Sequence, residues 1–406
     1  MVRIDSTLDL PTVIARAIAV SPAVALGDAG IRNARSEGRV AGGAYLPTLS
    51  ATSTALRSDI ATTPGIGTSG VTSYSAGLSS SLELFTGGRR GADQARSRAD
   101  LQAAEASGIT QRAQTTLIAQ RAYYEALRGG DLMTVADARV MRAERGLKYA
   151  QDRVRAGTAT KSDDLRARLE LTTARQQAIA ARDTLQTAAY SLGRIVGADG
   201  PVGARPPASL DPRALAMSDT AIVALATLAA PSVQAAEASA RASEAALRSA
   251  RSLYAPDIKL LGGYNFANQV AVIGATRPGW QLALGTSFPL FNGYQREDVV
   301  ARSDAFAEVS RVVALDAARQ VRTEASRLLS ALRFSEQNIA LAGEAVTAAQ
   351  EDLRVQTERY RAGIATSLDR LTSEVAVTQA ELGLVAAHYN YQITRATLEA
   401  LVGRSL

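Results

Sequence analysis

Few side chains in this 406-residue sequence could carry out chemistry on a substrate. Cysteine is absent and His388 is the single histidine, which excludes thiolate metal sites, cysteine nucleophiles and His-paired triads. Asp163 and Asp369 stand out, because each follows a threonine by three residues in nearly identical segments. Thr-x-x-Asp is the spacing of a capping box, which bonds the free amides that begin a helix. We therefore expect no catalytic site, no cofactor and no metal.

The two acids belong to an internal duplication. Residues 153–165 and 359–371 are identical at eight matched positions, at an offset of 206. The matches continue outward as Tyr45-Leu46-Pro47 with Tyr254-Ala255-Pro256, Leu84-Phe85-Thr86-Gly87 with Leu290-Phe291-Asn292-Gly293, and Val196-Gly197 with Val402-Gly403. Self-similarity in this order indicates two structural repeats, 1–197 and 231–406, joined by a proline-rich linker or equatorial segment, 198–230.

Long helices must position these acids. No proline occurs between Pro64 and Pro201 or after Pro289, and both tracts are rich in good helix formers. We expect long helices at about 88–150 and 294–356, with return helices at about 161–196 and 367–402. Apolar residues recur every seven positions in both tracts, which predicts antiparallel coiled coils. The two seams are Ala126, Met133, Val140 and Leu147, and Leu332, Ile339, Val346 and Leu353.

Each repeat also carries two segments with strand periodicity, at about 46–58 and 72–85, and at about 256–268 and 279–290. In three of the four, large residues alternate with small or polar ones, which predicts strands with unlike faces. Each has roughly the length that a tilted strand needs to cross a bilayer. Aromatic residues near the segment ends resemble a membrane-interface girdle; they are Tyr74, Tyr264, Trp280 and Phe288. A small soluble sheet with one wet face fits the alternation equally well.

Four strands cannot close a barrel, and open sheet edges are not tolerated in lipid. A cyclic homotrimer would supply twelve strands, which favours a mainly α fold with a shared β-barrel part. No uninterrupted apolar run approaches ~18 residues, so a transmembrane helix is not expected. The first residues lack an apolar core, so we expect any signal peptide to have been removed. The net charge is +6, but the basic residues do not form a patch with interleaved aromatic residues, so no nucleic-acid partner is expected.

The duplicated Tyr-x-Pro, Leu-Phe-x-Gly and R-x-R-A-G-x-A-T-x-x-D-x-L motifs together resemble the outer membrane efflux protein (TolC-like) family from Leu8 to Gly403. The resemblance implies a homotrimeric tunnel, with a twelve-stranded barrel in the lipid of a Gram-negative outer membrane. A twelve-helix α-barrel would extend into the periplasm. The implied partners are a periplasmic adaptor (membrane fusion) protein and an inner-membrane ABC transporter or proton-driven pump.

The same resemblance implies roles at the helix-connecting turns. Asp369 matches the first aspartate of an acidic ring at the periplasmic gate, and Thr372 stands where the family has the second. Tyr360 and Asp163 match a polar latch between neighbouring coils, whose arginine is replaced by Ala365. Either Arg359, Arg361 or Arg370 substitutes for it, or this gate is looser than in the family. We further expect exposed small residues at the tips to contact the adaptor; they are Ala156, Gly157, Ala362 and Gly363.

Two kinds of cargo and one different function remain open. The absence of a lipid-anchor cysteine favours a type I protein secretion channel over a multidrug or metal efflux component. A soluble coiled-coil scaffold would explain the helical seams, but it leaves the alternating segments unexplained.

Overall fold

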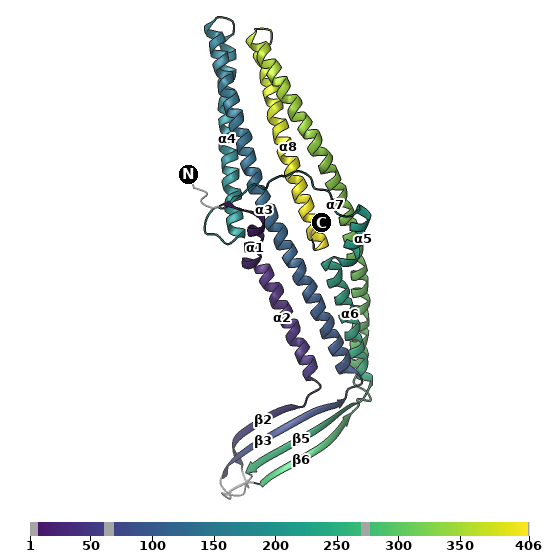
Figure 1. The fold of residues 1–406 in the computed structure, drawn as a ribbon. Helices are drawn as coiled ribbons and strands as arrows, with labels where there is room; N and C mark the ends of the chain where they lie inside the picture. Colours follow the sequence, from purple (N-terminus) through teal and green to yellow (C-terminus); the bar gives the residue numbers. More distant parts are fainter. Residues whose placement is uncertain (1–6, 61–68, 269–276, 405) are drawn as a thin grey trace. The chain divides into compact units, whose positions relative to one another are not determined.

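The computed structural model describes residues 7–60, 69–268, 277–404 and 406, and it confirms the mainly α fold (Figure 1). The chain forms two compact units. Unit 1 comprises Met1–Asp28, Ser107–Val233 and Ala317–Leu406, and unit 2 comprises Ala29–Ala106 and Gln234–Asp316. The long helices contribute residues to both units.

The elements follow the same order in each half of the chain: two helices, two strands, one very long helix and a return helix. In the first half these are α1 (Leu10–Val20), α2 (Pro22–Gly43), β2 (Thr48–Ile60), β3 (Ser69–Phe85), α3 (Arg89–Arg155) and α4 (Lys161–Ile195). In the second they are α5 (Asp219–Ala229), α6 (Pro231–Arg251), β5 (Asp257–Asn268), β6 (Arg277–Ser287), α7 (Gln295–Arg361) and α8 (Ser367–Val402). A 3-10 turn, Ser252–Tyr254, precedes β5.

The helices of unit 1 pack through the predicted seams. Both α3 and α7 contain 67 residues, and each turns back into its return helix (Figure 1). Leu332 is fully buried and Ile339 is 9% exposed, in a cluster that α5, α7 and α8 share. A second cluster joins α1, α3 and α4 around Val13, Tyr123 and Leu192. None of the four residues of either predicted seam is exposed, which confirms that these faces of the helices point inward.

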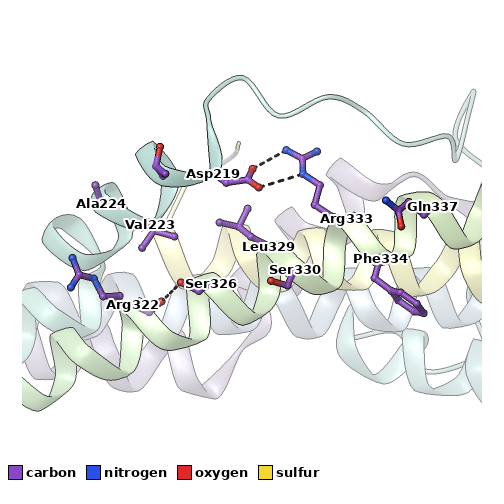
Figure 2. A pocket seen from close by; sticks show the side chains of 11 residues that line it. Asp219, Val223, Ala224, Arg322, Ser326, Leu329, Ser330, Arg333, Phe334 and Gln337 are labelled. Atoms are coloured by element: carbon purple, nitrogen blue, oxygen red, sulfur yellow. Dashed lines mark hydrogen bonds and ion pairs between the residues drawn. The ribbon is translucent and has the colours of Figure 1, made fainter.

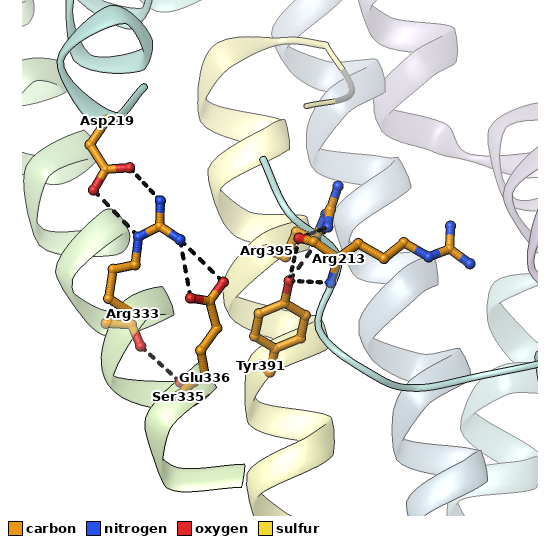
Figure 3. A network of polar contacts seen from close by, with 8 residues as sticks. Arg213, Asp219, Arg333, Ser335, Glu336, Tyr391 and Arg395 are labelled. Carbon is orange, nitrogen blue, oxygen red and sulfur yellow. Dashed lines mark hydrogen bonds and ion pairs between the residues drawn. The ribbon is translucent and has the colours of Figure 1, made fainter. Parts of the chain in front are cut away.

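The segment expected as a linker, 198–230, is part of unit 1. It contains α5 and a short strand, β4 (Gly203–Ala204), which pairs in parallel with β1 (Thr7–Leu8). The Tyr391 hydroxyl accepts from the Arg213 amide and donates to the Arg213 carbonyl, both at 3.0 Å (Figure 3). The Arg395 guanidinium donates to the same carbonyl at 2.9 Å. Side chains of α8 therefore satisfy backbone groups of a stretch that has little secondary structure of its own.

Unit 2 contains a four-stranded antiparallel sheet in the order β2-β3-β5-β6. Its register places large apolar residues side by side on one face, with Leu78 opposite Tyr264 and Tyr264 opposite Trp280. The other face aligns Ser79, Gly263 and Gln281. The predicted unlike faces are therefore confirmed. The strand bounds shift by a few residues: β3 begins at Ser69, and β6 ends at Ser287.

Helices α5 and α6 contain an 18-residue window of mean hydropathy 1.4, so by length and composition this stretch could cross a membrane, although the sequence predicted no such helix. A core helix has the same composition. Ile222, Ala226 and Ala230 in this stretch are fully buried in the first cluster of unit 1. The α5 part of the stretch therefore belongs to that core, and 33% of the apolar window is buried within the described chain.

Candidate pore entrance at the helix-connecting turns

The turns that join α3 to α4 and α7 to α8 have the same backbone design. Gly157 has φ +73° and Gly363 has φ +80°, the left-handed conformation that ends a helix at little cost for glycine. Thr160 then caps α4 and Thr366 caps α8, each through a complete capping box with the acid three residues on. The predicted capping boxes and glycine stops are thus confirmed. The tip residues Ala156, Gly157, Ala362 and Gly363 are exposed.

Each cap should contribute measurably to stability. Thr366→Ala removes the hydroxyl that accepts from the Asp369 amide at 3.2 Å, so it should lower the free energy of unfolding by about 1 kcal/mol. Thermal unfolding followed by helical circular dichroism would measure the loss. Thr372→Ala is the matched control, because the Thr372 hydroxyl donates only to the Leu368 carbonyl within the same helix. An equal loss in both variants would contradict the capping role.

The two capping acids differ in their surroundings. Asp369 is exposed, and its hydrogen bonds from the amide and hydroxyl of Thr366 lower the pKa of its carboxyl. Asp163 is half-buried and also accepts from the Ser367 hydroxyl at 2.5 Å, which is the largest cause of its lowered pKa. Both acids therefore stay charged at neutral pH. Of these two acids, Asp163 is the one that links the α3–α4 hairpin to the α7–α8 hairpin.

Tyr360 contacts an arginine that the sequence analysis did not name as a latch residue. The Arg153 guanidinium lies 4.5 Å from the centre of the Tyr360 ring and donates to the Tyr360 carbonyl at 2.9 Å. Tyr360 and Asp163 line the same small cavity, of about 20 Å³, but no hydrogen bond joins them. Tyr360 is 2% exposed, and its hydroxyl has no partner among the described residues. The sequence signal that could have pointed to Arg153 is its repetition as Arg359 at the matching position of the other repeat.

Of the candidate arginines, Arg370 also lies over the Tyr360 ring, 6.0 Å from its centre, whereas Arg361 contacts another tyrosine. Arg361 lies 4.6 Å from the centre of the Tyr149 ring and donates to its hydroxyl, which joins α7 to α3. Arg370 is buried and pairs with Glu374 on its own helix at 2.8 Å. Ala365, at the position of the family's latch arginine, is 8% exposed. Contacts between the hairpins at the turns therefore come from Arg153 and Arg361, together with the hydrogen bond between Asp163 and Ser367.

A layer of buried ion pairs lies just inside the turns, and the sequence analysis missed it. Glu374 is 1% exposed, one of its oxygens has no partner among the described residues, and burial raises the pKa of its carboxyl. Two further pairs connect helices, Arg142 with Glu381 at 3.0 Å and Arg139 with Glu170 at 2.7 Å. Arg370 and Glu374 are four residues apart, which indicates a helical ion pair but gives no sign of its burial.

A wider groove lies elsewhere in unit 1, between α5 and α7, with a volume of about 800 Å³ (Figure 2). Arg333 bonds Asp219 at 2.8 Å along it, and Glu336 bonds the same guanidinium at 3.1 Å (Figure 3). Phe334 is 68% exposed. The described residues hold no cluster of three or more potential metal ligands, here or at the turns.

Comparison with known proteins agrees with this geometry. The model of the family described as Outer membrane efflux protein matches residues 13–198 and 222–404. The chain is 25% identical over 412 residues to the pyoverdine export outer membrane protein OpmQ of Pseudomonas aeruginosa. That alignment covers 97% of this chain and 84% of OpmQ.

Solved structures share the fold. The outer membrane protein VceC from Vibrio cholerae superposes with a TM-score of 0.84 at 18% identity, over 98% of this chain and 96% of VceC. The outer membrane channel MtrE of Neisseria gonorrhoeae gives a TM-score of 0.80 at 21% identity, over 98% of this chain and 89% of MtrE. The localisation is accordingly the outer membrane of a Gram-negative bacterium, with an extension into the periplasm. The chain belongs to the outer membrane efflux protein family, as a channel of the efflux type.

Proposed function

We propose that three copies of the chain form an export channel, with a twelve-stranded barrel in the outer membrane and a tunnel of helices in the periplasm. The unlike faces of the four-stranded sheet carry this proposal. Among the described residues, β2 and β6 pair on one side only, so each leaves an unpaired edge. Because unpaired backbone groups are not tolerated in lipid, neighbouring copies would have to pair β2 with β6.

Detergent-solubilised protein tests this proposal directly. Cross-linking should yield a trimer, and the trimer should form stable pores in planar bilayers. A chain that stays monomeric and soluble without any amphiphile would instead support the coiled-coil scaffold. The sheet argues against that alternative, since Trp280, Leu282 and Leu284 on its apolar face are each more than 60% exposed in a single copy.

Asp369 would line the pore entrance, with Thr372 one helical turn further along α8. Three copies would then place three carboxylates around one axis, and rings of carboxylates favour cations. Asp369→Asn should lower the preference for cations over anions, measured as the reversal potential in planar bilayers under a salt gradient. Asp163→Asn is the matched control, because that carboxyl is half-buried and bonded to Ser367. Unchanged selectivity in Asp369→Asn would leave Asp369 with a capping role only.

The contacts of Arg153 with Tyr360 and of Arg361 with Tyr149 would hold the two hairpins together at the entrance. They would stand in for the latch of Tyr360, Asp163 and an arginine that the resemblance implies. A cationic side chain over an aromatic face is worth about 0.5–1 kcal/mol when exposed and about 2 kcal/mol when desolvated. Because Tyr360 is buried, its contact with Arg153 should be the stronger of the two.

The exposed tips would receive the periplasmic adaptor, which connects the channel to an inner-membrane transporter. OpmQ is named as a pyoverdine export protein, which favours small-molecule export as the cargo class, and type I protein secretion is the alternative. Expression with each kind of transporter and adaptor in a channel-deficient cell would separate the two. Restored drug or siderophore export would exclude a dedicated protein-secretion role.

A further inference from the structure

Helix α3 packs against α8 within one copy, and side-chain bonds at three levels fix the register of this contact. They join Arg121 to Thr397 at 3.2 Å, Asp131 to Tyr389 at 2.6 Å and Arg142 to Glu381 at 3.0 Å. At the repeat offset of 206, α3 corresponds to α7 and α8 corresponds to α4. The α3–α8 joint therefore has a counterpart, the α7–α4 joint, in which α7 would meet an α4 helix in the same register.

The face of α4 that this second joint would use is uncovered in one copy. On α8, Tyr389 and Ala396 are each 2% exposed. The corresponding residues of α4 are Asp183, which is exposed, and Tyr190, which is 44% exposed. A face that is buried in one repeat and exposed in the other lacks its partner helix. The α7–α4 joint is therefore not made within a single copy.

The two joints differ in which helix supplies the large side chain. In the α3–α8 joint, Tyr124 of α3 and Ala396 of α8 line one cavity. At the matching positions, α7 has Ser330 and α4 has Tyr190. The aromatic side chain and the small side chain have thus exchanged sides. Such an exchange keeps the total side-chain volume of the joint nearly constant, as close packing requires.

The groove between α5 and α7 lies where α7 would receive Tyr190. Ser326 and Ser330 line it from α7, and Val223 and Leu329 add apolar surface (Figure 2). Its volume is about 800 Å³, whereas the corresponding cavity of the α3–α8 joint has about 350 Å³. Serines make the α7 wall shallow, which leaves room for a large side chain from outside the copy.

A polar contact exchanges sides in the same way. In the α3–α8 joint the Tyr389 hydroxyl donates to the Asp131 carboxylate. At the matching positions, α7 has Gln337 and α4 has Asp183. Gln337 is exposed and lines the α5–α7 groove, so its amide can donate to the Asp183 carboxylate of a neighbouring copy. The acid has moved from the long helix to the return helix, but the pair stays complementary.

Of the other two bonds, one has a polar counterpart and one does not. Arg327 and Ser191 match the arginine and threonine at the first level, and an arginine can donate to a serine hydroxyl. Ala348 and Arg175 match the buried ion pair and cannot form one. The α7–α4 joint therefore depends more on the α5–α7 groove than the α3–α8 joint depends on its cavity.

We propose that the α5–α7 groove is the socket for Tyr190 of the partner subunit, so that α4 of each copy packs on α7 of the next. The proposal rests on the proposed function, since it takes the copies to form a ring. A second copy is the occupant because the repeat supplies a matching surface for both sides of the groove. Phe334 lines the same groove and is 68% exposed, so the neighbour would also cover apolar surface. Alternation of the two joints closes the ring of helices.

Exchanging the two side chains tests the socket. Ser330→Tyr should overfill the groove and Tyr190→Ala should leave it unfilled, so each should weaken association of the copies by about tenfold or more. The double variant Ser330→Tyr, Tyr190→Ala rebuilds the arrangement of the α3–α8 joint and should restore most of the trimer in detergent. Both residues are exposed in one copy, so the helical circular dichroism should not change.

The matched control combines Ser330→Tyr with Leu169→Ala, because Leu169 is 67% exposed on the same helix but lies far from Tyr190. This control should not regain the trimer. A double variant of positions 190 and 330 that is weaker than either single variant would mean that the two effects are independent. That result would overturn the socket.

Photo-cross-linking identifies the neighbour of position 190 directly. Benzoylphenylalanine in place of Tyr190 should join two copies on irradiation, and trypsin should place the bond in Leu328–Arg333, which contains Ser330, or in α5. Attachment within the same copy, to lipid or to another segment would contradict the proposal, and so would a trimer that gives no attachment. Chemical cross-linking of the unirradiated wild type tests the proposed function separately. A trimer there with a negative result at position 190 removes the socket alone, whereas no trimer removes the proposed function as well.

Discussion

Arg370→Ala should lower the free energy of unfolding by about 3–5 kcal/mol, since it leaves Glu374 as a buried charge without a partner. Glu374 is 1% exposed and Arg370 is its ion-pair partner at 2.8 Å. The space around Arg370 is tight, because a Cβ atom built on Gly146 would lie 2.5 Å from the guanidinium. Little room therefore remains for another side chain to replace the Arg370 guanidinium as the partner of Glu374. The unfolding midpoint of the detergent-solubilised protein would report the loss.

Two variants show whether burial is the cause. Arg354 forms an ion pair of similar length with Glu351, at 2.7 Å, but both side chains are at least 60% exposed. Arg354→Ala should therefore have little effect on the unfolding midpoint. The double variant Arg370→Met, Glu374→Leu removes both charges and should recover most of the stability that Arg370→Ala loses. A double variant as unstable as Arg370→Ala would contradict the unpaired-charge explanation.

The pH dependence of stability provides a further check on the same pair. Burial raises the pKa of the Glu374 carboxyl above its ordinary value of 4.5, so the folded chain holds this proton more tightly than the unfolded chain. Stability from this group is present below pH 4.5 and is lost as the pH rises through the raised pKa. Glu374→Gln removes the titrating carboxyl but also takes the ion-pair partner from the buried Arg370, so only the pH dependence of the difference reports the titration. The stability of the variant relative to the wild type should rise as the pH rises through the raised pKa. A difference that is independent of pH would show that Glu374 does not titrate in this way.

The largest functional effect is expected at the tips. Gly157→Leu combined with Gly363→Leu should abolish export while trimer formation and membrane insertion persist. A Cβ atom at Gly157 would have no neighbour within 4 Å, and one at Gly363 would lie 4.0 Å from the Arg153 guanidinium, so added bulk at the tips meets little of the chain itself. Six such tips, two from each of three copies, would form the surface for the adaptor. Export assays in cells, with trimer levels measured in the same membranes, would show the difference.

The matched control for the tips is alanine at both positions. Alanine carries the same unfavourable left-handed backbone as leucine but adds little bulk. Export by the alanine variant, with none by the leucine variant, would assign the effect to size. Normal export by the leucine variant would remove the tips from the adaptor interface.

Local patterns predicted the helices and their ends closely, whereas contacts between distant segments were beyond them. The expected long helix at about 294–356 is Gln295–Arg361 in the structure, because proline-free sequence and capping residues are local signals. The partner of Tyr360 could not be predicted, since Arg153 lies on another helix, 207 residues away. The burial of Glu374 was missed for the same reason.

The equal lengths of α3 and α7 restrict how this protein can evolve. Each contains 67 residues, so the two tips of one copy stand the same number of helical turns beyond their strands. A deletion in α3 alone would shorten that arm by about 1.5 Å per residue and rotate its remaining side chains by about 100° each. The two tips of one copy therefore stay equivalent only when α3 and α7 change length together. The length of the helices can thus change by seven residues in α3 and α7 together. A change of one residue in either helix alone should be selected against.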